Sequence, residues 1–321
     1  MRGPLLWLAV MALAWRAPAS DTVAEDRPTV IVVTGAGGED EFGKNFSKWS
    51  ADCEEAGRKS GARIISIGLK PVAATNDFEL LKQALAAESK DTTAELWLIL
   101  IGHGTYDGKE AKFNLQGPDF SADELAAWLK PFHRPVAVIN CASCSGPFIS
   151  KLSAPNRVIV AATRSGSEQN YARFGKYFSQ TLQDLQADLD KDGQVSLLEG
   201  FLSASFQVAE FYKLEGRLAT EHALIDDNGD GLGTPADWFR GIHAMKRAND
   251  NAALDGFRAH QFHLIRSDEE KKLSGPVRAR RDELELALAK LRDEKKNLPE
   301  ADYYKKVETL LLELANLYQV K

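Results

Sequence analysis

Residues 96–104 read LWLILIGHG, an uninterrupted apolar run that ends in a glycine–histidine–glycine turn. Similar apolar runs, rich in β-branched residues, occur at 28–34, 135–139 and 157–162. Runs that are apolar at every position, rather than at alternate ones, indicate strands buried on both faces. Such strands are typical of a parallel sheet covered by helices on both sides, so we expect an α/β fold with a mostly parallel sheet.

The rest of the chain has helical character. Helical patterns lie between the strands at 45–60 and 77–89, and Ser121 with Glu124 forms a capping box that opens a helix ending at Leu129. After about residue 178 the strand-like runs stop, and from about residue 268 the chain is very highly charged. We therefore expect an α/β domain at 27–182, a helical region at 183–245 and a C-terminal helical hairpin at 246–321.

The N-terminus has the pattern of an export signal. Residues 1–20 read MRGPLLWLAVMALAWRAPAS, with an arginine, an apolar run and then small residues. The run of about eleven residues is shorter than a membrane span needs, so a cleaved signal peptide at 1–20 is expected. The mature protein would then be secreted or periplasmic, without a membrane span.

Composition excludes several classes of protein. The 321 residues include 40 Lys+Arg and 46 Asp+Glu, which gives a net charge of −6 and argues against nucleic-acid binding. Three cysteines, Cys53, Cys141 and Cys144, are too few for a disulfide scaffold or a four-thiolate zinc site. Their odd number leaves at least one thiol without an internal partner.

A histidine and two cysteines follow neighbouring strands. His103 and Gly104 come directly after the run at 96–101, and the sequence NCASCSG, with Cys141 and Cys144, comes after the run at 135–139. The carboxyl ends of strands in such a sheet converge on one crevice. An imidazole there can convert a thiol to its nucleophilic thiolate, and a glycine N–H can stabilise an oxyanion. The Cys-x-x-Cys spacing also suggests a second, redox interpretation.

This order of strand, His-Gly, strand and Cys resembles the caspase-like cysteine peptidases, with the legumain branch most similar. The stretches VIVVTGAGGEDEFGKNFSKWSADCEEAG (30–57) and RVIVAATRSGSEQNY (157–171) carry the resemblance, which covers about 28–178. It implies a caspase-like sheet, peptide or protein substrates, His103 as catalytic histidine and Gly104 as oxyanion donor.

The nucleophile is left open between two cysteines. The spacing to the Ala161–Thr163 stretch and the following Ser145-Gly146 favour Cys144, with its own N–H as a second oxyanion donor, whereas counting from the end of the strand favours Cys141. The expected function is an exported cysteine endopeptidase with a Cys/His dyad. The alternative is a catalytically inactive, caspase-like calcium-binding scaffold or interaction protein.

A calcium-loop pattern begins at Asp188, and we name residues 188–199 loop 1. Oxygen ligands stand at every required position, and Gly193 stands at the sharp turn. Flanking helical patterns at 174–187 and 196–213 make this an EF-hand-like, helix–loop–helix unit. The expected Ca²⁺ ligands are Asp188, Asp190, Asp192, Gln194 (through its carbonyl), Ser196 and Glu199.

A weaker copy, loop 2, occupies residues 226–237. Gly233 stands where an apolar residue would pair the two loops, and Pro235 alters the exit. The expected Ca²⁺ ligands are Asp226, Asn228, Asp230 and Asp237, the last shorter than the usual closing glutamate. Calcium is abundant outside the cytoplasm, so a structural role is favoured for both loops.

The C-terminal residues predict two amphipathic helices, at about 276–295 and 300–319, that pack as an antiparallel hairpin. Asn297-Leu298-Pro299 makes the break between them. This hairpin is expected to dock a protein partner or to support oligomerisation. Its apolar stripes consist of Leu284, Leu288 and Leu291 in the first helix and Val307, Leu311, Leu314 and Tyr318 in the second.

Overall fold

The computed structural model describes residues 27–70, 75–249 and 252–318, and the signal peptide predicted at 1–20 lies outside them. In this part of the chain, seven strands form the central sheet in the order β10-β9-β8-β7-β3-β1-β2. The strands are β1 (Thr29–Thr34), β2 (Arg63–Ile67), β3 (Leu96–Ile101), β7 (Val136–Asn140), β8 (Arg157–Ala161), β9 (Leu224–Asp226) and β10 (Thr234–Pro235).

The core of the sheet is parallel, as the sequence predicted. β2, β1, β3, β7 and β8 pair in parallel, and all residues of β1, β3, β7 and β8 are buried. The strand β2 was not predicted, because this edge strand is half-exposed and lacks a continuous buried run.

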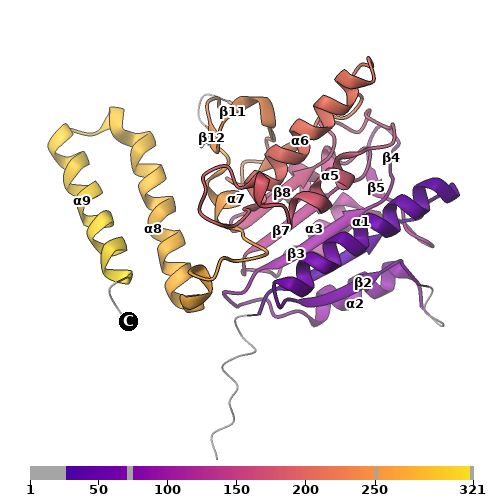
Figure 1. The fold of residues 1–321 in the computed structure, drawn as a ribbon, viewed down its shortest axis with the longest axis horizontal. Helices are drawn as coiled ribbons and strands as arrows, with labels where there is room; N and C mark the ends of the chain where they lie inside the picture. Colours follow the sequence, from indigo (N-terminus) through magenta and orange to yellow (C-terminus); the bar gives the residue numbers. More distant parts are fainter. Residues whose placement is uncertain (1–26, 71–74, 250–251, 319–321) are drawn as a thin grey trace, which may run out of the picture.

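Helices cover both faces of the sheet (Figure 1). The helices α1 (Asp40–Lys59), α5 (Phe174–Thr181) and α6 (Leu197–Leu214) contribute to one apolar core, where Trp49, Phe178 and Phe201 are buried. The opposite core contains residues of α2 (Asp77–Ala87), α3 (Ala122–Leu129) and α4 (Pro147–Leu152). The predicted capping box of Ser121 and Glu124 is present at the start of α3.

The prediction that strands stop near residue 178 is wrong. β9 pairs antiparallel with β8, and β10 pairs antiparallel with β9, so the sheet continues beyond loop 1. The predicted helix 174–187 is also shorter, because α5 ends at Thr181 and only a 3-10 turn, η1 (Leu185–Ala187), follows. Residues on both sides of the expected boundary at 182 therefore share one sheet and one core.

Smaller elements surround the main sheet. The strands β4 (Gly104–Tyr106), β5 (Ala111–Phe113) and β6 (Phe120–Ser121) form a second sheet directly after His103. β11 (Phe239–Arg240) pairs with β12 (His243–Ala244). Short helical turns occur at η2 (Ala236–Trp238), η3 (Glu270–Lys272) and η4 (Glu294–Asn297), and α7 spans Phe257–Gln261.

The predicted C-terminal hairpin is present as α8 (Gly275–Asp293) and α9 (Glu300–Leu317), which pack on each other beside the sheet (Figure 1). Leu284 and Leu291 are buried, whereas Leu311 and Tyr318 of the predicted second stripe are about half exposed, at 48% and 52%. In the described ranges, no helix is both long and apolar enough to traverse a bilayer.

A buried ion pair joins the C-terminal end of α2 to the segment that precedes β7. Glu88 and Arg134 are only 3% and 2% exposed in their side chains and lie 3.2 Å apart. Arg134 also donates to the carbonyls of Ala94 and Glu95, and Thr29 donates to Glu88. Each charge is thus compensated where water is excluded.

We expect Arg134→Ala to lower the free energy of unfolding by about 3 kcal/mol, at the low end for breaking a buried ion pair, because Arg63 remains as a second cationic partner of the Glu88 carboxylate. Urea denaturation followed by circular dichroism measures this loss. Lys48→Ala, which removes an exposed pair with Asp52, is the control and should change stability little. Equal effects of the two substitutions would contradict the expectation.

Candidate functional site

The two strand ends that the sequence singled out lie next to each other. Ser143, which follows β7, has its hydroxyl 3.2 Å from both the N–H and the carbonyl of Gly104, next to His103. A Cβ at Gly104 would lie 2.2 Å from the Ser143 carbonyl oxygen, so only glycine allows this approach. The predicted convergence of these two turns is therefore present.

His103 is packed in an aromatic pocket. Its ring centroid lies 4.9 Å from that of Phe46, 5.3 Å from Phe42 and 6.1 Å from Tyr171. Burial lowers the pKa of His103, and a hydrogen bond with the backbone of Gly37 only partly offsets this effect. The imidazole is thus neutral at pH 7 and can act as a base.

Cys141 is a core residue. It is 2% exposed and belongs to the apolar core on the α1 side of the sheet, where a Cβ at Gly175 would lie 2.9 Å from its own Cβ. Burial raises the pKa of Cys141 far above that of a free thiol, and it does the same for Cys53. A thiol in this environment stays protonated and unreactive.

Cys144 is also withdrawn from solvent. It is 1% exposed, has a left-handed backbone with φ of 55° and donates its N–H to the Glu168 carbonyl at 2.9 Å. Burial raises the pKa of Cys144, and a hydrogen bond with Ser143 partly opposes that rise. All three cysteines are free thiols, so the Cys-x-x-Cys pair forms no disulfide.

The dyad and the oxyanion donors that the resemblance implies stay predictions, and the structure gives the contacts of these residues. Within the described residues, no hydrogen bond joins His103 to Cys141 or Cys144. The proposed donors also have other partners, because Gly104 donates to the Ser143 hydroxyl and Cys144 to a carbonyl. Ser143 was not predicted, because a serine between two cysteines has no sequence signal of its own.

Loop 1 brings its carboxylates together. Carboxylate oxygens of Asp188, Asp190 and Asp192 lie within 4.8 Å of one another. The backbone turns through left-handed conformations at Lys191 and Gly193, with φ of 64° and 88°, and Gly193 donates its N–H to Asp188. Acceptor oxygens clustered in this way fit a hard cation such as Ca²⁺, which takes six to eight of them.

The closing residue of loop 1 is in place. Glu199 is 1% exposed, and its Oε1 accepts from the N–H groups of Leu189 at 2.7 Å and Asp190 at 3.4 Å. Its Oε2 accepts from the Ser196 hydroxyl at 2.7 Å. The carboxylate is thus held against the start of the loop, where it can complete a cation site.

Loop 2 repeats this backbone pattern between two strands rather than between helices. Asp226 accepts from the N–H groups of Gly229 and Gly231 at 3.1 and 3.0 Å, and both glycines have positive φ. Asn228 accepts from the N–H of Asp230 at 2.8 Å. Loop 1 therefore lies between the 3-10 turn η1 and the helix α6, whereas loop 2 lies between the strands β9 and β10.

Asp255 occupies the closing position of loop 2. Its Oδ1 accepts from the N–H groups of Asp227 at 3.0 Å and Asn228 at 3.3 Å, and its Oδ2 accepts from the Thr234 hydroxyl at 2.5 Å. These partners match, position by position, those of Glu199 in loop 1. The predicted ligand Asp237 is instead exposed on η2 and takes no part in these hydrogen bonds.

The path of the chain explains why a distant residue, Asp255, contacts loop 2. The backbone leaves loop 2 as β10 and η2, not as an α-helix, so the residue at the usual closing position does not turn back toward the loop. Asp255 reaches it from 28 residues beyond Asp227. The loop motif in the sequence does not point to Asp255, because this residue lies well downstream of the motif.

Charge at loop 2 is only partly compensated. Asp255 is 3% exposed, and burial together with the neighbouring carboxylates of Asp227 and Asp226 raises its pKa to about 8. Burial also raises the pKa of Asp226. A divalent cation would relieve this cost, although only the carboxylates of loop 1 lie within 4.8 Å of one another in the described part of the chain.

No protein-family model and no curated protein matches the sequence. Among solved structures, caspase-1 from Spodoptera frugiperda is similar at 11% identity and a TM-score of 0.41, covering 69% of this chain and 94% of that chain. The Drosophila initiator caspase Dronc is similar at 14% identity and a TM-score of 0.42, with 71% and 95% covered. The protein GSU0716 from Geobacter sulfurreducens is similar at 12% identity and a TM-score of 0.37, covering 56% of this chain and 89% of that chain. These similarities concern the fold alone.

We expect Cys53 and Cys141 of the native protein to resist alkylation by iodoacetamide at pH 7.5, and Cys144 to react slowly, because all three thiols are buried and protonated. Peptide mapping by mass spectrometry at a series of times measures each rate. The same protein in denaturant is the control and should be alkylated at all three positions. Rapid labelling of Cys141 or Cys144 in the native protein would overturn this assignment.

Proposed function

We propose that this chain is an exported, calcium-binding protein that uses a caspase-like α/β sheet as a scaffold rather than as a cysteine peptidase. The observation that carries the proposal is the matched pair of closing carboxylates. Glu199 in loop 1 and Asp255 in loop 2 are both buried, and each accepts from the same two backbone positions and one hydroxyl. Two loops prepared alike favour a shared ligand, and their oxygen donors favour Ca²⁺.

The positions of the two loops favour a structural role for the cation. Loop 1 connects η1 to α6, whose buried face includes Leu198, Phe201 and Ala204. Loop 2 connects β9 to β10 at the edge of the central sheet. A cation at loop 1 would stabilise the start of α6, and a cation at loop 2 would stabilise the turn between β9 and β10.

The state of the cysteines supports the scaffold over the peptidase. A cysteine peptidase needs a thiolate near an imidazole, and burial instead raises the pKa of both Cys141 and Cys144. We infer export from the pattern at 1–20, and export agrees with a calcium-dependent protein because calcium is abundant outside the cytoplasm.

We expect the mature protein to bind two Ca²⁺ ions by isothermal titration calorimetry. Glu199→Gln and Asp255→Asn should each remove one site, because each substitution replaces a closing carboxylate oxygen with an amide. Asp237→Asn is the matched control within loop 2 and should retain both sites. Absence of calcium binding would end the proposal, and loss of a site in Asp237→Asn would contradict the role of Asp255.

Calcium should also stabilise the fold. At a free calcium concentration of a hundred times the dissociation constant, one site adds about 2.7 kcal/mol to the free energy of unfolding. Urea denaturation with calcium and with chelator measures the difference. Wild-type protein should show a larger increase than either Glu199→Gln or Asp255→Asn, and equal curves in all samples would refute a stabilising role.

One observation favours peptidase activity as a second candidate: the His103 turn and the segment after β7 do meet, through Gly104 and Ser143. Incubation of the mature protein with a peptide library tests it, and under the scaffold proposal we expect no cleavage above that of His103→Ala. Cleavage lost in Cys144→Ala or Cys141→Ala would support the cysteine peptidase. Cleavage lost only in Ser143→Ala would place the nucleophile on a hydroxyl.

A further inference from the structure

A segment from the C-terminal part of the chain lies along loop 1. We name residues 260–267 the strap. It runs from the end of α7 towards η3, and therefore connects the core to the α8–α9 hairpin. Its contacts with loop 1 involve residues that sequence alone did not connect with the calcium site.

The strap pairs with the exit of loop 1 as a short antiparallel strand would. Ser196 forms an isolated antiparallel bridge with His263, and Leu197 donates its N–H to the Phe262 carbonyl at 2.8 Å. Phe262 and Leu264 are 2% and 3% exposed and anchor the strap in the core. Loop 1 is thus paired with the strap and not with loop 2.

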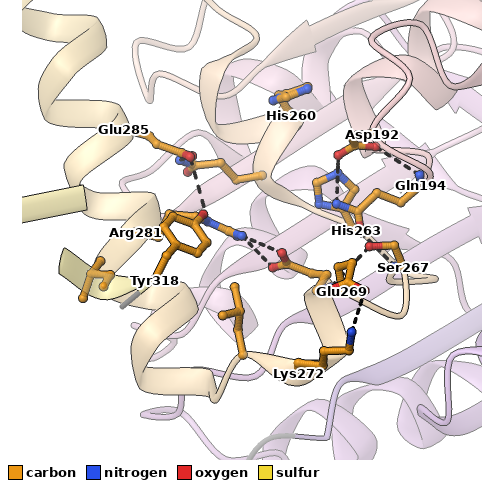
Figure 2. A pocket seen from close by; sticks show the side chains of 14 residues that line it. Asp192, Gln194, His260, His263, Ser267, Glu269, Lys272, Arg281, Glu285 and Tyr318 are labelled. Carbon is orange, nitrogen blue, oxygen red and sulfur yellow. Dashed lines mark hydrogen bonds and ion pairs between the residues drawn. The ribbon is translucent and has the colours of Figure 1, made fainter. Parts of the chain in front are cut away.

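Strap side chains also reach the cation-facing carboxylates. His260 Nε2 lies 2.9 Å from Asp190 Oδ2. His263 Nε2 lies 4.0 Å from Asp192 Oδ2 (Figure 2). His263 is 7% exposed, and its Nε2 has no hydrogen-bond partner within the described structure. A buried ring nitrogen that faces an acidic loop without a hydrogen bond is uncommon, and it marks His263 as part of the surroundings of the loop 1 carboxylates.

A third contact involves the amide of Gln194. Its Nε2 donates to Asp192 Oδ2 at 2.9 Å, and its Oε1 accepts from the Ser267 N–H at 3.0 Å. The side chain of Gln194 therefore connects an expected calcium ligand to the far end of the strap. Each carboxylate oxygen can accept more than one partner, so these contacts leave room for a cation.

The hairpin is attached to the body next to this place. Arg281 Nη1 of α8 donates to both carboxylate oxygens of Glu270 of η3, at 2.8 and 2.6 Å, and Gln261 donates to the Asp282 carbonyl at 2.9 Å. A cavity of about 650 Å³ lies between loop 1, the strap and α8 (Figure 2). Movement of the strap would thus alter both the calcium ligands and the base of the hairpin.

We propose that the strap is the outer shell of the loop 1 calcium site, so that calcium binding and the attachment of the α8–α9 hairpin stabilise each other. This inference rests on the proposed function, because it requires calcium at loop 1. Coupling of this kind is reciprocal. The free energy by which the attached hairpin strengthens calcium binding equals the free energy by which bound calcium stabilises the attachment of the hairpin.

The first test uses calcium affinity in the full mature chain, with loop 2 silenced by Asp255→Asn so that loop 1 alone is titrated. Removal of outer-shell partners typically weakens metal binding by 10–100-fold, so we expect at least about a tenfold weaker affinity in His260→Ala combined with Gln194→Ala. His243→Ala, a histidine exposed on β12, is the matched control and should leave the affinity unchanged.

The second test uses hydrogen exchange measured by mass spectrometry on the same proteins. Calcium should slow exchange in peptides from the strap and from the start of α8, and Glu199→Gln should abolish that protection. Unchanged calcium affinity of loop 1 in the variant with His260→Ala and Gln194→Ala would overturn the coupling but not the proposed function. Calcium binding without any change in hydrogen exchange would do the same. Absence of calcium binding in the wild type would instead overturn the proposed function.

Discussion

Burial of the central strands on both faces is the constraint on which the rest of the structure depends. β3 and β7 lie in the middle of the sheet with every residue buried, so their backbone groups must pair with neighbouring strands and their side chains must meet helices on both sides. This requirement sets the parallel order of β1, β3, β7 and β8. It also brings the turns after β3 and β7 to the same edge, where Gly104 contacts Ser143.

The same constraint determines the fate of the cysteines. A side chain directly after a buried strand can point into the core or towards the edge of the sheet. Cys141 points into the apolar core and Cys144 is covered, so both thiols are kept in their protonated form. Proximity of the two turns is therefore not sufficient for a dyad, because the chemistry depends on side-chain direction and solvent access as well.

The two acidic loops show how one pattern of hydrogen bonds to a carboxylate can form on different chain paths. In loop 1 the closing carboxylate comes from the first turn of α6, where Ser196 and Glu199 also form a capping box. In loop 2 the chain leaves as a strand, and Asp255 enters from a distant segment. Each arrangement places an acceptor against the same backbone N–H groups, although the two carboxylates reach them from different elements.

Sequence by itself determined the buried strands, the capped helices, the acidic loops and the C-terminal hairpin, because each depends on residues close together in the chain. Apolar runs, the Ser121–Glu124 box and the spacing of Asp188, Asp190 and Asp192 are local patterns with local physical causes. Only the tertiary structure decided that Asp255, and not Asp237, accepts from the loop 2 backbone, that Ser143 meets Gly104, and that β9 and β10 extend the sheet. These contacts join residues far apart in the chain, and packing of the whole core selects them.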